Sequence, residues 1–120
     1  MKYVISPFMF VADKNYLFKI ELEDILYVEC DCYISTIVML DGAKYNTTKP
    51  LSYYESELPR CIFYRINRSC IVSLRHVLSI KNYGNRAHFV YMRDGKSHKV
   101  SCRRWKDFKR FLINIYDAGQ

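Results

Sequence analysis

Basic and amide side chains alternate with apolar residues between positions 63 and 77. Arg65, Asn67 and Arg68 lie among side chains that suit a protein core. An arginine guanidinium neutralises phosphate and can form two parallel hydrogen bonds with guanine, and an asparagine amide can do the same with adenine. Because the apolar neighbours would anchor this segment in the fold, we predict that it presents its cations rigidly to an anionic partner.

A second group of cations stands where a C-terminal helix is expected to begin. Arg103, Arg104 and Lys106 follow Ser101, whose residue type favours the N-cap position. The free backbone N–H groups of a helix N-terminus also favour a phosphate. A single exposed arginine is weak evidence for phosphate binding, because the aliphatic part of an arginine side chain commonly covers apolar surface while its charge stays in water.

The charge is unevenly distributed along the 120-residue chain, whose formal net charge is +7. Residues 1–60 carry six Lys/Arg and nine Asp/Glu, and residues 61–120 carry thirteen Lys/Arg and three Asp/Glu, which gives balances of −3 and +10. Such asymmetry indicates a polyanionic partner, either nucleic acid or an acidic membrane surface. A basic surface with no such partner is the alternative, since charge governs association rather than fold.

Catalytic and metal-binding patterns are weak in this sequence. It has no Gly-rich phosphate loop, no His-Glu-x-x-His and no nucleophile elbow, and its three histidines are scattered. Its five cysteines form no Cys-x-x-Cys pair, and most stand in or beside apolar runs, where a reduced cysteine behaves as a small buried side chain. We therefore expect no enzyme, no cofactor and no metal site.

Length and hydropathy predict one soluble domain over residues 1–120. Half of the residues are apolar, which is enough to build a packed core. The apolar residues 1–12 are unlike a signal peptide, because Pro7 interrupts them and Asp13 follows at once. Apolar stretches of membrane-spanning length are absent from the sequence. We expect a cytoplasmic protein without a membrane partner.

Short apolar and β-branched runs predict a mainly β fold. The Asp41-Gly42 and Asp94-Gly95 pairs predict tight hairpins, and no internal repeat is evident. A bend is expected near Asn67-Arg68, inside one strand. The expected strands are 8–12, 16–20, 25–30, 34–40, 43–47, 63–74, 77–80, 87–93 and 97–100.

Two segments have helical periodicity. Pro50 and Pro59 bound a short internal helix over residues 50–58, and a C-terminal helix is expected over residues 103–116. The apolar residues that recur at helical spacing are Leu51, Tyr54 and Leu58 in the first segment and Trp105, Phe108, Leu112 and Ile115 in the second. The predicted fold is therefore mainly β with two helices.

Four segments in this order resemble one protein family. They read FKIELEDILYVE at 18–29, YNTTKPL at 45–51, FYRINRSCIVSLRHVLSI at 63–80 and DGKSHKVSCR at 94–103. Together they resemble the LytTR DNA-binding domain, the output module of many bacterial response regulators, over about residues 8–113. The third segment is the most distinctive, because the family commonly reads Phe-x-Arg-Ile-His-Arg-Ser-Tyr-Ile-Val-Asn there.

The resemblance implies a fold and a function. The expected fold has antiparallel sheets stacked as an elongated β sandwich, whose loops enter successive major grooves of double-stranded DNA. The expected function is sequence-specific DNA binding by a bacterial transcription regulator of a two-component system. Carried over by position, the resemblance implies base or groove contacts for Arg68, Arg103 and Tyr33 and phosphate contacts for Lys49, Arg104 and Lys106. Asn67, which stands where the family usually has His, and Ser69 are predicted as a base contact and a phosphate contact from their own hydrogen-bonding groups.

Alternatives and partners stay open at this point. RNA or single-stranded nucleic acid is the first alternative, because the chain's eleven tyrosines include candidates for stacking on bases. A protein-interaction module is the second, since Asp31 would repel phosphate from its loop. Because no receiver domain is expected in this chain, control by a separate signalling protein is a possible arrangement, as is a homodimer on paired direct repeats.

Overall fold

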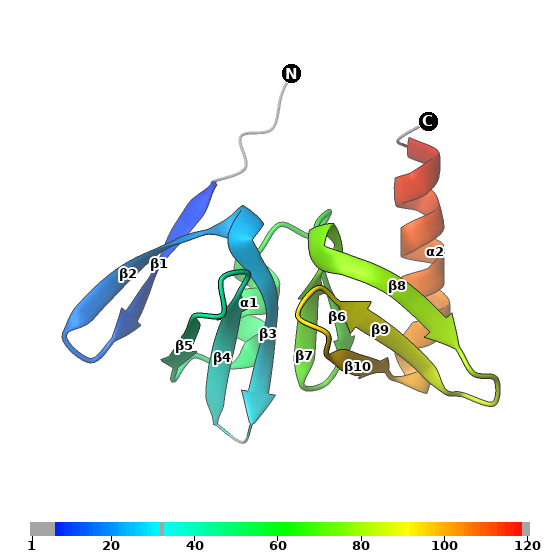
Figure 1. Cartoon of the computed structure of the whole chain (residues 1–120), viewed down its shortest axis with the longest axis horizontal. Helices are drawn as coiled ribbons and strands as arrows, with labels where there is room; N and C mark the ends of the chain where they lie inside the picture. Colours follow the sequence, from blue (N-terminus) through cyan, green and yellow to red (C-terminus); the bar gives the residue numbers. More distant parts are fainter. Residues whose placement is uncertain (1–6, 32, 119–120) are drawn as a thin grey trace.

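The computed structural model describes residues 7–31 and 33–118, with side chains up to residue 114. The described strands form three antiparallel sheets, in the orders β1-β2, β5-β4-β3-β7-β6 and β10-β9-β8 (Figure 1). The predicted mainly β fold with two helices is confirmed. The elements are β1 (Phe8–Asp13), β2 (Tyr16–Glu21), β3 (Ile25–Asp31), β4 (Ile34–Met39), β5 (Lys44–Thr47), α1 (Leu51–Glu57), β6 (Phe63–Asn67), β7 (Cys70–Ser73), β8 (Val77–Asn82), β9 (His88–Met92), β10 (Ser97–Val100) and α2 (Cys102–Ala118).

Both faces of the five-stranded sheet are buried. On one face, Val28 of β3 packs in a cluster with the β1-β2 hairpin and α1, and on the other face Tyr27 packs in a cluster with β9, β10 and α2. A strand covered on both sides needs a continuous apolar run, which Ile25-Leu26-Tyr27-Val28 supplies. A β-bulge between Ile25 and Tyr27 places both Leu26 and Tyr27 in the second cluster.

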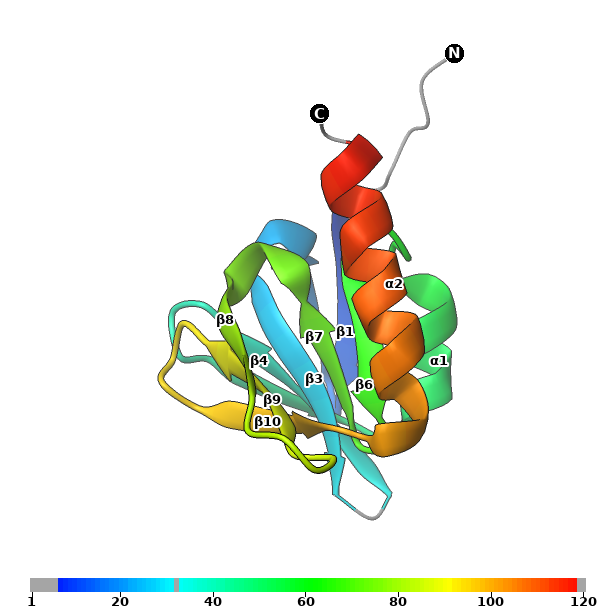
Figure 2. The ribbon, with the colours of Figure 1, turned by 90° about the vertical axis from the view of Figure 1, so that its right-hand side faces the viewer.

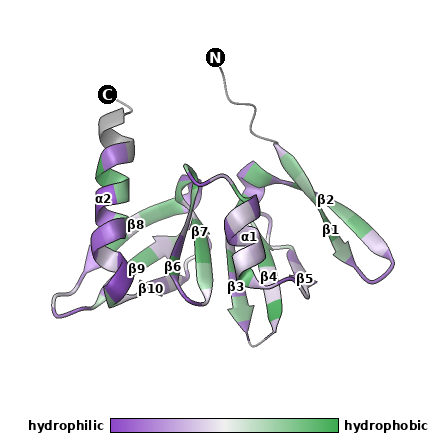
Figure 3. Ribbon diagram, turned by 180° about the vertical axis from the view of Figure 1, so that it is seen from behind, coloured by the Kyte–Doolittle hydropathy of each residue, from purple (hydrophilic) through white to green (hydrophobic). Residues whose placement is uncertain are grey.

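The two helices lie on the same side of the molecule (Figures 2 and 3). Helix α1 is capped by Pro50, which precedes the first turn instead of entering it, and the helix buries Leu51 and Tyr54. Helix α2 begins after Ser101, whose carbonyl accepts the backbone N–H groups of residues 104 and 105. Phe108 is fully buried and attaches α2 to the second cluster. The side chain of Ile115 lies outside the described residues.

The strand expected over residues 63–74 is two strands. The chain reverses fully at Arg68-Ser69, so that β6 and β7 pair as a hairpin, and the predicted bend is therefore a tight turn. The Asn67 side-chain oxygen accepts the Ser69 backbone N–H at 2.6 Å. This local hydrogen bond mimics a backbone turn, which explains a reversal in a segment that has no glycine.

An internal repeat that the sequence analysis did not detect becomes visible in the fold. Two hairpins, β1-β2 and β6-β7, each lead into a 3₁₀ turn, Leu22–Asp24 or Leu74–His76, and then into a strand with a β-bulge near its start. His76 Nε2 donates to the Glu23 carbonyl oxygen at 2.5 Å and so links the two turns. The first turn directly precedes β3 of the central sheet, and the second directly precedes β8.

A half-buried histidine lies where β10 meets the central sheet. The Tyr27 hydroxyl donates to the Asp94 carboxylate at 2.8 Å, and the His98 ring lies 4.3 Å from the Tyr27 ring, centroid to centroid. The buried Nε2 atom of His98 has no hydrogen-bond partner among the described residues. Burial lowers the pKa of His98, although the nearby Glu29 and Asp94 carboxylates act in the opposite direction.

His98 should make the protein less stable in mild acid. Below the ordinary histidine pKa of 6.5, the unfolded chain takes up a proton that the folded side chain resists, so the free energy of unfolding falls as pH decreases. We expect His98→Gln to remove this part of the decline. Urea unfolding of the wild-type protein and His98→Gln at about pH 7.5 and 5.5 measures the loss of unfolding free energy in acid. An equal loss in the two proteins would show that His98 does not cause it.

Candidate nucleic-acid interface

Four turns and loops gather along one edge of the molecule, at the bottom of Figures 1 and 2. They are Asp31 and Tyr33 between β3 and β4, the turn at residues 67–69, the loop at residues 83–87, and the start of α2 at residues 102–106. We call these segments the loop edge. Figure 3 shows that the start of α2 on this edge is strongly hydrophilic.

Hydrogen bonds within the loop edge and at the residues directly beside it join its segments to one another. The backbone N–H of Cys30 donates to the Ser69 carbonyl at 2.8 Å, and that of Ser101 donates to the Ile66 carbonyl at 2.9 Å. The Arg86 side chain donates to the Cys102 sulfur at 3.4 Å. Segments that are far apart in the sequence therefore have fixed relative positions.

The Arg65 side chain, from β6, binds the carbonyl groups of the β6-β7 turn. Its guanidinium donates to the Asn67 carbonyl at 3.3 Å and to the Arg68 carbonyl at 2.8 Å, and it forms an ion pair of 3.0 Å with Glu55 of α1. The Arg65 side chain is only 18% exposed, so the pair is shielded from water more than a surface pair. The sequence analysis counted Arg65 among the cations presented to an anionic partner, and its geometry is that of a clamp inside the protein.

The Asn67 side chain uses both of its polar atoms inside the protein. Its nitrogen donates to the Lys99 carbonyl at 2.6 Å, and its oxygen accepts from Ser69. The amide therefore connects the β6-β7 turn to β10. Asn67 as a base contact stays a prediction, and such a contact would have to break at least one of these two hydrogen bonds.

Other predicted contact residues are free to reach outward. Arg68, Ser69, Arg103 and Lys106 are exposed, and Tyr33 is 89% exposed. An open pocket of about 300 Å³ separates Tyr33 from Arg68, and Thr48 and Ser52 line it as well. The structure thus brings the predicted loop residue and the predicted turn residue to one concave surface.

Two of the predicted phosphate contacts already have partners. The Arg104 guanidinium is half-buried and donates to the Arg65 carbonyl at 3.4 Å, and the Lys49 ammonium lies 4.9 Å from the centre of the Tyr53 ring. Arg86, which the sequence analysis did not single out, adds an exposed cation to the loop edge. Its position beside Cys102 depends on sheet pairing and could not be read from the local sequence.

The described part of the chain offers neither a metal-binding cluster nor a membrane-spanning helix. No cluster of three or more His, Cys, Asp or Glu side chains within residues 7–31 and 33–118 is arranged to hold a metal ion. No helix described by the structure is long and apolar enough to cross a membrane.

Exposed cations on interlocked loops, carried by a β scaffold, are typical of a nucleic-acid-binding domain. Residues 15–113 match the family described as the LytTr DNA-binding domain, and the chain belongs to that family. A solved structure described as the LytTr DNA-binding domain of a putative methyl-accepting/DNA response regulator from Bacillus cereus has the same fold. Its TM-score is 0.80 at 19% identity, and the match covers 89% of this chain and 97% of that chain.

Relatives of known name are longer proteins. The transcriptional regulatory protein LytR of Staphylococcus aureus strain MW2 is 34% identical over 74 residues, which are 62% of this chain and 30% of the relative. The sensory transduction protein LytR of Staphylococcus haemolyticus is 32% identical over 93 residues, which are 78% of this chain and 36% of the relative. The chain thus spans about a third of the length of these relatives.

Replacing Arg65 by Lys should weaken DNA binding although we assign Arg65 no DNA contact. A lysine keeps the charge, but its compact ammonium cannot bridge Glu55 and two turn carbonyls as a guanidinium does. We expect the affinity for DNA to fall about 5- to 30-fold, equivalent to about 1–2 kcal/mol of lost hydrogen bonding. Fluorescence anisotropy with labelled duplex measures the change.

The matched variant is Glu55→Gln, which removes the charge of the clamp's partner but keeps a hydrogen-bond acceptor. We expect a smaller loss of affinity from this change than from Arg65→Lys. Wild-type affinity in Arg65→Lys would mean that the β6-β7 turn keeps its shape without the clamp.

Proposed function

We propose that this chain binds double-stranded DNA sequence-specifically through its loop edge, as the DNA-binding part of a bacterial transcription regulator in the cytoplasm. Family membership supports DNA binding. The observation that carries the specific mode is the β6-β7 turn, which is held on both sides while Arg68 at its tip stays exposed. A turn fixed before binding loses little conformational entropy when it enters a groove.

The roles of the contact residues follow from their exposure and chemistry. Arg68 and Arg103 are exposed guanidiniums on neighbouring segments, and each would form two parallel hydrogen bonds with guanine in the major groove. Tyr33 would extend the contact beyond Arg68 across the shared pocket. Ser69, Lys106, Lys49 and Arg104 would contact phosphates, the last two after exchanging their present partners.

A regulator built this way has further partners. We propose that two copies bind paired direct repeats, because a single loop edge covers a short stretch of duplex. A separate signalling protein, or segments beyond this chain, would supply the control that its longer relatives combine in one protein. The family match favours duplex DNA over the RNA-binding and protein-interaction alternatives for the loop edge.

Arg103→Ala and Arg68→Ala should reduce discrimination between DNA sequences. A preferred site is first selected from a random duplex pool, and anisotropy titrations then compare that site with random duplex of equal length. We expect a cost of about 1–3 kcal/mol on the selected site for each variant and a smaller loss on random DNA. Equal losses on the two DNAs would instead make the residue a phosphate contact.

Arg110→Ala is the matched control for Arg103→Ala. Arg110 is an exposed arginine of the same helix, two turns further on, and its guanidinium lies 3.5 Å from the Asp107 carboxylate. We expect it to leave discrimination unchanged. If Arg110→Ala and Arg103→Ala behave alike, the loop edge is not the reading surface.

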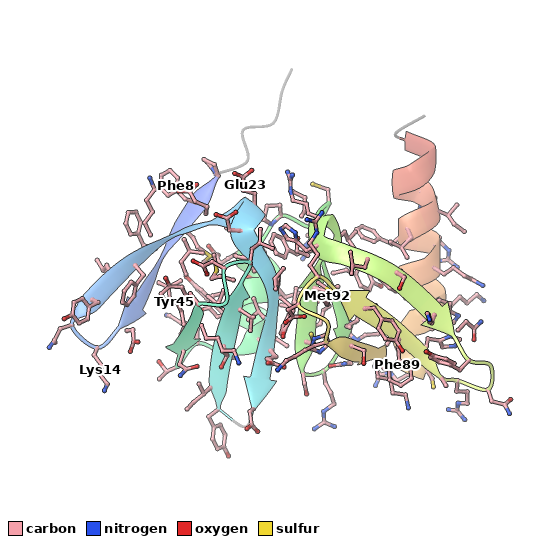
Figure 4. The ribbon with its side chains drawn as sticks, viewed as in Figure 1. Phe8, Lys14, Glu23, Tyr45, Phe89 and Met92 are labelled. Carbon is pink, nitrogen blue, oxygen red and sulfur yellow. The ribbon has the colours of Figure 1, made fainter. Side chains whose placement is uncertain are left out.

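Lys106→Gln should change the salt dependence of binding. Each phosphate that a lysine neutralises releases condensed counterions, so removing one contact lowers the slope of log affinity against log salt by about 1. We expect this reduction on selected and random duplex alike, measured from about 50 to 300 mM salt. Lys14→Gln, at the tip of the β1-β2 hairpin (Figure 4), should leave the slope unchanged, and an unchanged slope in Lys106→Gln would remove that contact.

A further inference from the structure

The outer face of the β10-β9-β8 sheet is covered by no other element in the cartoon (Figure 1). Its inner face carries Val90, Met92 and Val100, which are fully buried. Because side chains alternate along a strand, the residues between them point outward. The register of the sheet arranges the outward residues in two rows, Lys81-Phe89-Lys99 and Ser79-Tyr91-Ser97.

Three aromatic side chains meet on this outer face. Phe89 and Tyr91 are half-exposed, and Tyr83, from the loop after β8, is 59% exposed. The Tyr83 hydroxyl lies 2.6 Å from the Tyr91 hydroxyl, and the Tyr83 ring meets the Phe89 ring edge-on at 5.9 Å. Figure 4 shows Phe89 toward the opposite end of the molecule from Lys14. We call Tyr83, Phe89 and Tyr91 the aromatic platform.

Cations surround the aromatic platform. Lys81 and Lys99 flank Phe89 on the neighbouring strands, and the Lys81 ammonium lies 5.6 Å from the centre of the Tyr91 ring. Residues 77–100 contain five Lys/Arg and a single acidic residue, Asp94. The Asp94 carboxylate accepts the Tyr27 hydroxyl of the central sheet, so this exposed acidic residue is engaged with the central sheet.

We propose that this face binds single-stranded nucleic acid, with unpaired bases stacked on Phe89 and Tyr91 and phosphates paired with Lys81 and Lys99. Aromatic rings interleaved with cations are what a single strand needs, because bases stack on rings and the backbone follows positive charge. Phe89 and Tyr91 are about 7 Å apart along the strand, so each ring has room to stack one base. In duplex DNA the faces of the bases are stacked on one another, so they are not available to stack on Phe89 and Tyr91.

The aromatic platform adjoins the loop edge and shares Tyr83 with it, whereas Phe89 and Tyr91 lie outside the loop edge on β9. The Lys99 carbonyl accepts the Asn67 amide, so the cation row of the sheet begins where the β6-β7 turn ends. A single strand on the platform would therefore lie beside a duplex on the loop edge. The inference adds a second ligand to the proposed function and does not depend on it.

Anisotropy titration of the full chain with fluorescein-labelled dT15 and U15, at about 50 mM salt, tests the proposal. We expect both probes to bind, with Phe89→Leu and Tyr91→Leu each weakening binding about 5- to 100-fold, the range of one lost base stack. Tyr91→Phe and Phe89→Tyr keep the ring and should bind as wild type does. A preference for dT15 or for U15 identifies the strand as DNA or RNA.

Matched controls come from the far end of the molecule. Tyr16 is 67% exposed on the β1-β2 hairpin, so Tyr16→Leu removes an equivalent ring and Lys14→Gln an equivalent charge, and neither should change the affinity for the probes. Failure of wild type to bind dT15 and U15, or equal losses in Tyr16→Leu and Phe89→Leu, would overturn the proposal. If Phe89→Leu loses dT15 binding but keeps its affinity for duplex DNA, the aromatic platform and the loop edge bind different ligands.

Discussion

The burial of the five-stranded sheet on both faces is the constraint on which the rest of the structure depends. With α1 and the β1-β2 hairpin on one face and α2 with the β10-β9-β8 sheet on the other, the middle of the molecule is mostly apolar, with a few buried polar side chains such as Ser35 and Thr47. Polar and charged groups are costly there unless they are paired. Charged groups are therefore concentrated on the surface and where strands end, and four exposed cations of the second half of the chain, Arg68, Arg86, Arg103 and Lys106, lie on the loop edge.

Arg65 shows how a charge close to this core can still serve the edge. A largely buried guanidinium must have its donors satisfied, since an uncompensated charge is strongly destabilising. Glu55 and two turn carbonyls satisfy it, and the same contacts fix the turn that carries Arg68. The requirement to pair one arginine thus determines the direction of the next, which explains why two arginines three residues apart have different roles.

The predictability of each element follows the sequence separation of the contacts that define it. The Asp41-Gly42 and Asp94-Gly95 hairpins and the Pro50-bounded helix were predicted because their causes are local. The reversal at Arg68-Ser69 was predicted only as a bend, because the segment lacks the glycine that usually marks a tight turn. A hydrogen bond to the Asn67 side chain stabilises the turn instead. The engagement of the Asn67 amide with Lys99 spans 32 residues, and no local pattern could reveal it.

The charge asymmetry of the sequence becomes an asymmetry in space. The first 3₁₀ turn of the internal repeat carries Glu23 and Asp24, and it lies at the opposite end of the molecule from the loop edge (Figures 1 and 4). Arg68, Arg86, Arg103 and Lys106 lie on the edge itself. Cations gathered on one edge attract that edge toward a polyanion before contact. Because the Debye length is about 8 Å at physiological salt, this steering acts only in the last approach, and the rigid turns complete the recognition.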